Sequence, residues 1–142
     1  MIALLLTACI PAGTYPLQAL PDEDDLASFL HAQGEASVDY DPTQGWDLTV
    51  AITIRNDGQA SPRVDLVNSH VRVNGVSWAP CRFPDDVNQD LFFLTLSPGE
   101  EVVRTLTCAD IPQPSAGLEL RFGATQAGGR GVIELSFAGV TP

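Results

Sequence analysis

Few side chains in this sequence are suited to catalysis. Its two histidines are His31 and His70, and hydrolysis by a Ser-His-Asp set needs a histidine held beside the nucleophile. His31 follows an acidic segment, and His70 should lie at the surface, because it sits in an expected strand opposite the face of Val71 and Val73. The chain also lacks a Gly-x-Ser-x-Gly nucleophile elbow. We therefore expect a protein that is not an enzyme, with a hydrolase of unrecognised site as the remote alternative.

Acidic residues gather in two stretches whose oxygen atoms are of the type and spacing that calcium uses. They are Asp39, Asp41 and Asp47 in one stretch, and Asp85, Asp86 and Asp90 in the other. Neither stretch has the spacing of an EF-hand, so we expect solvated loop carboxylates, with calcium binding as the alternative. Two histidines and one methionine are too few ligands for copper. The sequence thus predicts neither a bound metal nor another cofactor.

The net charge of −11 bears on possible partners. All seven basic residues are arginines, and the chain has no lysine. Nucleic-acid binding needs clustered cations, so we expect no nucleic-acid partner. The acidic character also disfavours peripheral binding to anionic lipid head groups. Solubility and self-repulsion are the plainer consequence of this charge.

A different chemistry is indicated near the start of the chain. A short apolar run over residues 2–6 leads into Leu6-Thr7-Ala8-Cys9. This run is far shorter than the roughly 20 apolar residues of a membrane-spanning helix. The stretch resembles the lipobox of bacterial lipoproteins, where a signal peptide is cleaved and the new N-terminal cysteine is lipidated. The resemblance implies that residues 1–8 are a signal peptide and that acyl chains on Cys9 hold the protein on a membrane. The alternative is an N-terminal strand in which Cys9 is a buried thiol.

The same resemblance implies a location in the bacterial cell envelope. In proteobacterial lipoproteins an aspartate directly after the lipidated cysteine marks retention in the inner membrane. Ile10 occupies that position, which favours the outer membrane if the organism has one. With Cys9 lipidated, Cys81 and Cys108 remain as an even pair in an oxidising compartment, so we expect a disulfide between them. Two separate buried thiols are the alternative.

Residues 9–34 are expected to connect the anchor to the folded domain. Residues 10–20 contain two prolines, one glycine and no charge, which is typical of a tether. Residues 21–34 are predicted to form a short acidic helix, because Asp22 can cap its start and Leu26, Phe29 and Leu30 share one helical face. A solvated acidic linker is the alternative to this helix.

From residue 35 onward the pattern predicts β-strands. Residues 46–55 alternate between apolar and polar types, which indicates a half-buried strand. Residues 64–73 form the next strand, with a bulge near Asn68 because the apolar positions change parity there. Asn74-Gly75 favours a type I′ turn, which would pair Val71 with Trp78.

Two more hairpins are expected after a long loop over residues 79–90. The first joins residues 91–96 to residues 101–108 through the Ser97-Pro98-Gly99-Glu100 turn. The second joins residues 118–122 to residues 133–137 across a glycine-rich loop. Seven or eight strands with one short N-terminal helix predict an all-β fold, an antiparallel β-sandwich.

Three features of these strands resemble bacterial immunoglobulin-like domains over residues 36–140. They are the strand end Ile54-Arg55-Asn56-Asp57-Gly58, the turn Leu96-Ser97-Pro98-Gly99-Glu100, and the closing Leu-x-Leu and Ile-x-Leu strands. The resemblance implies an immunoglobulin-like β-sandwich over residues 35–142. The antibody order of Cys, Trp and Cys is absent, because Trp78 precedes Cys81. Domains of this kind have many functions, so the resemblance implies none in particular.

Aromatic residues near the loop that carries Cys81 form a candidate binding surface. They are Trp78, Phe83, Phe92 and Phe93. Phe92 and Phe93 are adjacent in one expected strand and must face opposite sides of it, so one of them needs cover or a partner. Ordinary packing is the alternative. We therefore expect a lipid-anchored envelope protein with a non-catalytic binding or spacer domain, whose partner is an envelope protein or glycan. A structural accessory subunit of an envelope assembly is the alternative function.

Overall fold

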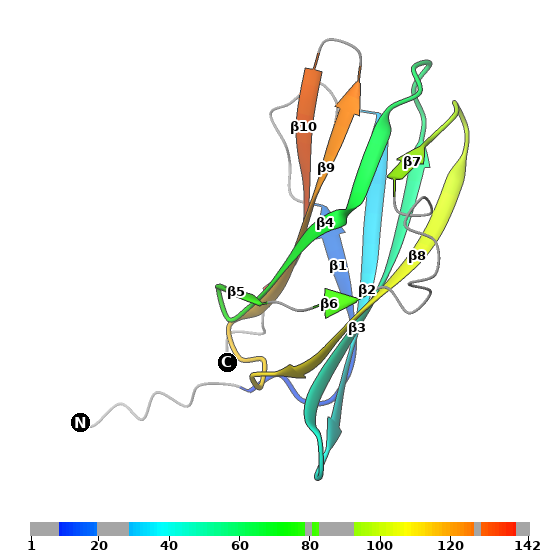
Figure 1. Ribbon diagram of the computed structural model, residues 1–142. Coiled ribbons are helices and arrows are strands. Elements are labelled where there is room, and N and C mark those ends of the chain that lie inside the picture. Colours follow the sequence, from blue (N-terminus) through cyan, green and yellow to red (C-terminus); the bar gives the residue numbers. More distant parts are fainter. Residues whose placement is uncertain (1–8, 20–28, 79–80, 83–92, 127–128, 139–142) are drawn as a thin grey trace, which may run out of the picture.

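A computed structural model describes residues 9–19, 29–78, 81–82, 93–126 and 129–138. Within these residues every regular element is a strand, and the strands form an antiparallel sheet that curls into a half-barrel (Figure 1). The strands are β1 (Gly13–Ala19), β2 (Leu30–Asp41), β3 (Gly45–Asn56), β4 (Arg63–Val73), β5 (Val76–Trp78), β6 (Cys81–Arg82), β7 (Phe93–Thr95), β8 (Glu101–Ile111), β9 (Gly117–Gln126) and β10 (Gly129–Ala138). No helix in the described residues is long and apolar enough to cross a membrane.

The sheet runs continuously in the order β5-β4-β9-β10-β1-β2-β3-β8-β6, with β7 paired to β4. Its concave side holds a single core, to which both halves of the sheet contribute. Leu48, Val50 and Ile52 point into it from β3, while Leu120 and Leu135 enter from β9 and β10. Curling lets one sheet bury its apolar face against itself, as two packed layers would.

Several local expectations are confirmed. The alternating stretch is β3, which ends at Asn56 as expected. The register of β4 against β9 shifts between Asp65 and His70, which places the irregularity across the position expected for the bulge. Asn74 and Gly75 have φ values of 56° and 76°, and the turn pairs Val71 with Trp78. Positive φ at both central residues is what a type I′ turn requires.

Of the two hairpins predicted after residue 90, the closing one is confirmed, because residues 118–122 pair with residues 133–137, whereas the first differs from the structure. The Ser97–Glu100 turn forms, and Gly99 has a φ of 79°, but β7 pairs with β4 whereas β8 pairs with β3. The turn therefore crosses between the two halves of the sheet instead of closing a hairpin. The loop expected over residues 123–131 is much shorter, because β9 and β10 pair from Gly117↔Ala138 to Gln126↔Gly129.

The predicted N-terminal helix is wrong where the structure describes it. Residues 20–28 lie outside the described residues, and Leu30 to Gly34 are the first part of β2. Leu30 and Ala32 are buried while His31 and Gln33 are exposed, which is the two-residue period of a strand. All of β2 pairs with β3 in unbroken register, and this pairing outweighs the local helical pattern.

The expected tether also contains regular structure. Gly13 to Ala19 form β1, which pairs with β2 from Gly13↔Val38 to Gln18↔Gln33. Leu17 is buried and pairs with Gly34. A Cβ atom at Gly34 would lie 3.2 Å from Leu17 and from Leu135, which is tighter than an ordinary contact. Glycine at position 34 therefore allows Leu17 of β1 to pack closely against β2. The folded domain consequently begins well before residue 35.

The all-β, antiparallel part of the fold prediction is confirmed, whereas the immunoglobulin-like sandwich is not. In immunoglobulin domains the second and third strands belong to different sheets. Here β2 and β3 are neighbours in one sheet and pair along their whole lengths. The ten described strands exceed the expected seven or eight because β1 and the short β6, which were not expected, join the sheet.

Asn56 is the buried polar residue that closes the end of β3. Its side-chain amide donates to the carbonyl oxygens of Ala60 and Leu96, at 2.7 and 3.0 Å. Its side-chain oxygen accepts from the Gly58 N–H at 2.9 Å. The side chain is fully buried, so these bonds satisfy polar groups that have no access to water.

Candidate functional site

Cys9 is an exposed free thiol at the edge of the folded domain. The next residue, Ile10, is buried, with 4% of its surface exposed. The N–H of Ile10 donates to the carbonyl oxygen of Pro114 at 2.7 Å. Cys9 is therefore accessible for modification but is attached directly to the domain surface, and the alternative of a buried thiol in a strand is wrong.

The loop between β8 and β9 joins this N-terminal segment to two hairpins. Ile111, just before the loop, pairs with Trp46 at the start of β3. The carbonyl oxygen of Gln113 accepts from the side-chain amide of Asn74, in the β4–β5 turn, at 2.9 Å. In Figure 1 the β2–β3 turn lies at the bottom of the molecule, and the β4–β5 turn lies higher, at the left. We call the region that contains Cys9, the β2–β3 turn and the β4–β5 turn the N-terminal end of the domain.

Asn74 fixes this arrangement through its side chain. Its side-chain oxygen accepts from the Ser115 and Ala116 N–H groups, at 2.6 and 2.9 Å. Its backbone N–H donates to the carbonyl oxygen of Gly117 at 3.0 Å. One residue thus holds both the β4–β5 turn and the loop on which Ile10 rests.

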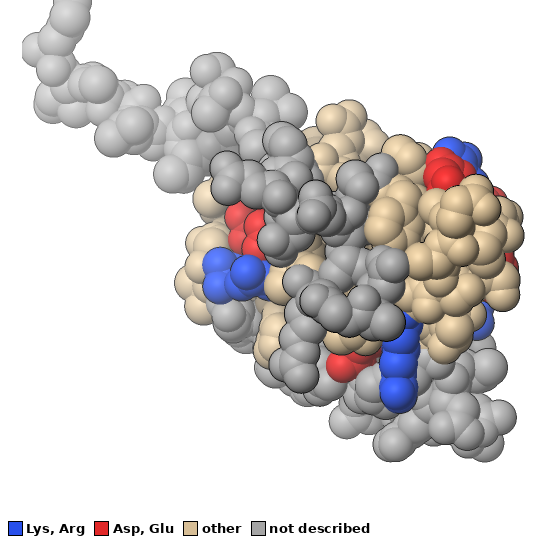
Figure 2. Space-filling model, turned by 90° about the horizontal axis from the view of Figure 1, so that it is seen from above, with Lys and Arg blue, Asp and Glu red and all other residues tan. Residues whose placement is uncertain are grey.

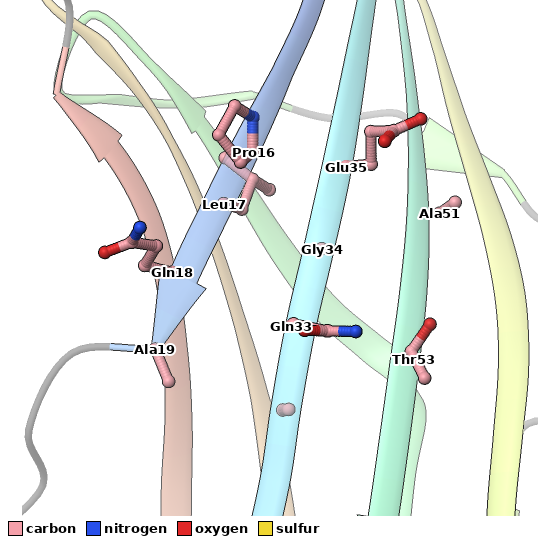
Figure 3. A pocket seen from close by; sticks show the side chains of 10 residues that line it. Pro16, Leu17, Gln18, Ala19, Gln33, Gly34, Glu35, Ala51 and Thr53 are labelled. Carbon is pink, nitrogen blue, oxygen red and sulfur yellow. The ribbon is translucent and has the colours of Figure 1, made fainter.

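A groove of about 600 Å³ lies on the outer face of β1, β2 and β3 (Figure 3). The sheet register arranges its outward side chains in two rows. Gln18, Gln33 and Thr53 form one row across the three strands, and Pro16, Glu35 and Ala51 form the other. Neighbouring strands are about 4.8 Å apart, so each row spans roughly 10 Å. We call this the outer groove.

The outer groove suits a neutral polar ligand. Gln18 and Gln33 each offer an amide donor and acceptor, Glu35 offers acceptors, and Pro16 and Ala51 provide apolar contact surface. None of the lining residues is cationic, so the groove has no side chain that would attract an anion. Within the described part of the chain, no side-chain hydrogen bond of Gln18, Gln33 or Glu35 is found, which leaves these groups available to a ligand.

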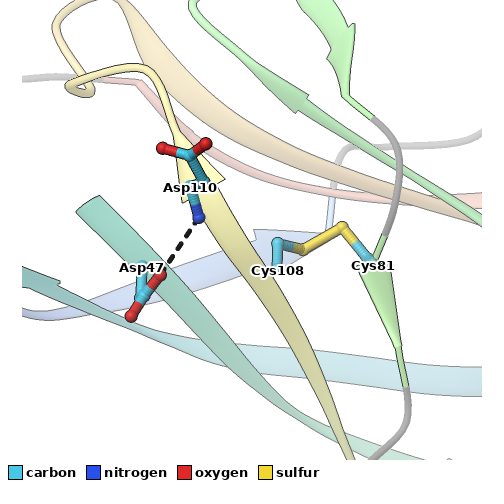
Figure 4. Close-up of a disulfide and its surroundings, with 4 residues drawn as sticks. All are labelled: Asp47, Cys81, Cys108 and Asp110. Carbon is cyan, nitrogen blue, oxygen red and sulfur yellow. Dashed lines mark hydrogen bonds between the residues drawn. A yellow bond between two sulfur atoms is a disulfide. The ribbon is translucent and has the colours of Figure 1, made fainter. Parts of the chain in front are cut away.

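The predicted disulfide is confirmed. The sulfur atoms of Cys81 and Cys108 are bonded, and the two Cα atoms lie 4.2 Å apart (Figure 4). The bond joins β6 to β8, where the two residues are also paired backbone neighbours. Cys108 is fully buried, so the disulfide is a structural link.

The aromatic surface expected near Cys81 stays a prediction, because half of its residues lie outside the described part of the chain. Phe83 and Phe92 lie outside the described residues. Trp78 ends β5 and Phe93 begins β7. These two strands pair with opposite ends of β4, at Val71 and at Asp65, so the structure does not bring their backbones together.

The two histidines lie on the surface, far from a catalytic arrangement. His70 is exposed in β4, as expected. His31 lies 3.1 Å from Asp57, whose carboxylate also accepts two bonds from Arg55, at 2.7 and 2.9 Å. The hydrogen bond from Arg55 lowers the pKa of Asp57 below its usual range. This exposed group is an ion-pair network at the end of β3, with no described serine or threonine side chain bonded to His31.

The first acidic stretch was expected in a loop, but its residues lie in strands, with Asp39 and Asp41 at the end of β2 and Asp47 near the start of β3. Asp41 accepts from the Thr43 hydroxyl and N–H, at 2.6 and 2.7 Å, and these bonds lower its pKa. Asp47 accepts from the Asp110 N–H at 3.1 Å (Figure 4). The described residues contain no group of three or more potential ligands that could hold a metal. Asp85, Asp86 and Asp90 lie outside the described residues.

Charged side chains alternate in sign over the end of the molecule opposite the N-terminal end. Figure 2 shows Arg side chains beside acidic ones in small groups separated by uncharged surface. Among the described ion pairs, Arg121 Nε lies 2.9 Å from Glu134 Oε1. Such a surface provides no continuous cationic track for a phosphate backbone.

No known protein family, curated protein or solved structure matches this chain. The sequence predicted the disulfide but not the outer groove, whose residues come from three strands. The outward positions of β2 and β3 carry polar side chains that could have indicated a binding face. The groove forms only because β1 pairs beside β2.

Proposed function

We propose that the protein is a lipid-anchored protein of the bacterial cell envelope, with a domain that binds a ligand without catalysis. The observation that carries this proposal is Cys9, which ends the lipobox-like stretch Leu6-Thr7-Ala8-Cys9 and is exposed directly before the first buried residue. Cleavage before Cys9 would remove no described residue. The Cys81–Cys108 disulfide supports the proposal, because such bonds are typical of exported proteins.

The anchor predicts a simple labelling result. In the native bacterial host, the protein should incorporate a radiolabelled or clickable fatty acid, and Cys9→Ser should abolish the label because serine lacks the thiol that accepts the diacylglycerol. Mass spectrometry of the purified protein should place the modification on an N-terminal Cys9. Cys81→Ser, which leaves Cys9 intact, is the matched control and should still be labelled. Labelling that persists in Cys9→Ser would refute the anchor.

The outer groove is the binding site that we assign to the anchored domain. It lies on the convex face of the sheet, whereas the hydrophobic core fills the concave face. Its amides, carboxylate and apolar side chains complement an envelope glycan, or a polar segment of an envelope protein, better than an anionic ligand. The Leu96–Glu100 turn and the strand end at Asn56 resemble immunoglobulin-like domains in sequence, although the pairing of β2 with β3 differs from the arrangement in those domains.

Site-specific photocrosslinking tests this assignment. A photoreactive amino acid in place of Gln33, at the centre of the groove, should give a crosslinked adduct in intact cells. The same residue in place of Thr125, which is exposed on β9 and separated from the groove by β10, should give little. Equal adducts from both positions, or none from Gln33, would count against the groove as the binding site.

A further inference from the structure

The N-terminal end of the domain carries apolar side chains that the core does not cover. Tyr40 is 55% exposed and Val76 is 61% exposed, two of the four large apolar residues that are exposed in the described structure. The ring of Tyr40 lies against that of Trp46, with centroids 4.9 Å apart. Trp46 packs against the core on its other side. The apolar face of the sheet thus continues past the core to the β2–β3 turn.

These side chains lie at the same end as the anchor residue. Trp46 and Ile111 are paired, which places their Cα atoms about 5 Å apart. Ile111 is three residues from Pro114, a separation of at most about 11 Å, and Pro114 is bonded to Ile10. Val76 follows the turn that Asn74 ties to the same loop. The β8–β9 loop thus connects the Cys9 segment to both the Tyr40–Trp46 pair and the hairpin that carries Val76.

We propose that the Tyr40–Trp46 pair and Val76 form a membrane-contact surface, which inserts into the head-group region of the bilayer to which Cys9 is attached. This inference rests on the proposed lipid anchor. Tyrosine and tryptophan are the residues enriched at membrane interfaces, because each combines an apolar ring with a polar group that stays hydrated. Insertion removes exposed apolar surface from water. The Ile10–Pro114 bond, in place of a flexible tether, keeps the surface oriented toward the lipid.

Charge around the surface selects the kind of lipid. Four aspartates surround this surface. Asp39 and Asp41 flank Tyr40, Asp47 follows Trp46, and the N–H of Asp110 donates to the carboxylate of Asp47. The nearest arginine along the described β4–β5 hairpin, Arg72, faces Glu119 at 4.0 Å. Anionic head groups would repel these carboxylates. The surface therefore suits a zwitterionic leaflet, such as one of phosphatidylethanolamine or phosphatidylcholine.

An artificial anchor tests the surface without relying on native lipidation. The chain from Cys9 onward, which contains every described strand, would be coupled through the Cys9 thiol to phosphatidylcholine vesicles that carry a maleimide lipid. Trp78→Phe leaves Trp46 as the single tryptophan. Its emission should shift to shorter wavelength on coupling and should be quenched by brominated phosphatidylcholine. Tyr40→Ser should reduce this quenching. Vesicles with added phosphatidylglycerol should also reduce it, and salt should restore it.

The matched control carries its tryptophan at the other end of the sheet. Val103 is 54% exposed and pairs with Thr53, seven residues along β3 from Trp46. In a Trp46→Phe, Trp78→Phe background, Val103→Trp should show neither the shift nor the quenching. Equal quenching at both ends, or none at Trp46, would overturn the membrane-contact surface. Failure of fatty-acid labelling in cells would instead overturn the native anchor, so the two proposals fail separately.

Discussion

Removing the Cys81–Cys108 disulfide should lower the free energy of unfolding by about 3.5 kcal/mol, because the bond closes a long loop and limits the unfolded chain. The two cysteines are 27 positions apart, and the bond holds β6, a strand of two residues. Two backbone pairs alone connect β6 to β8. We expect the loss of the bond to release β6 while the rest of the sheet stays folded.

Reduction of the wild-type protein measures this effect most directly, because both sulfur atoms remain in place. Urea unfolding with and without dithiothreitol gives the difference in the free energy of unfolding. The double variant Cys81→Ser, Cys108→Ala should lose at least as much, since Cys108 is fully buried and alanine leaves a small cavity there. An unchanged unfolding midpoint on reduction would show that the bond makes no contribution.

Asn56→Ala should lower the free energy of unfolding by about 3 kcal/mol, since each of three backbone groups loses its hydrogen-bond partner at a cost of roughly 1 kcal/mol. The groups are the Gly58 N–H and the carbonyl oxygens of Ala60 and Leu96. Asn56 is fully buried, so water does not readily replace the amide. The turn after β3 and the start of the Ser97–Glu100 turn should both loosen.

The neighbouring residue supplies the control for this variant. Arg55 is half exposed and pairs with Asp57 on the surface, and exposed ion pairs contribute about 0–1 kcal/mol. Arg55→Ala should therefore cost much less than Asn56→Ala, although the two residues are adjacent. Urea unfolding of both variants measures the two losses in the free energy of unfolding, and hydrogen exchange of the Gly58 N–H reports the local loosening. Similar losses for the two variants would contradict the role of the buried amide.

Local patterns predicted the elements that depend on nearby residues. The alternation along β3 and the Asn74-Gly75 turn were both identified correctly, because burial on one face and positive φ constrain residue type at each position. The disulfide followed from an even number of remaining cysteines. In each case the deciding interaction is either within the element or fixed by the chemistry of the residue.

The errors arose where distant pairing decides the structure. Leu26, Phe29 and Leu30 have helical spacing, yet Leu30 pairs with Asn56 as part of β2. The segment 91–108 reads as a hairpin, yet its two strands join different partners. Long-range strand pairing overrides local propensity in this way. The outer groove was missed for the same reason, since its rows exist only after three strands are in register.

A lipid anchor on Cys9, as proposed, would hold the domain close to its membrane, because Ile10 is attached directly to the domain. Eleven free residues would extend by at most about 37 Å, but β1 takes seven of them into the sheet. The distance along β2 from Tyr40 to Gln33, in the outer groove, is about 23 Å at the rise per residue of a strand. The outer groove therefore stands at a nearly constant height, and ligands held further from the lipid surface than this short distance are beyond its reach.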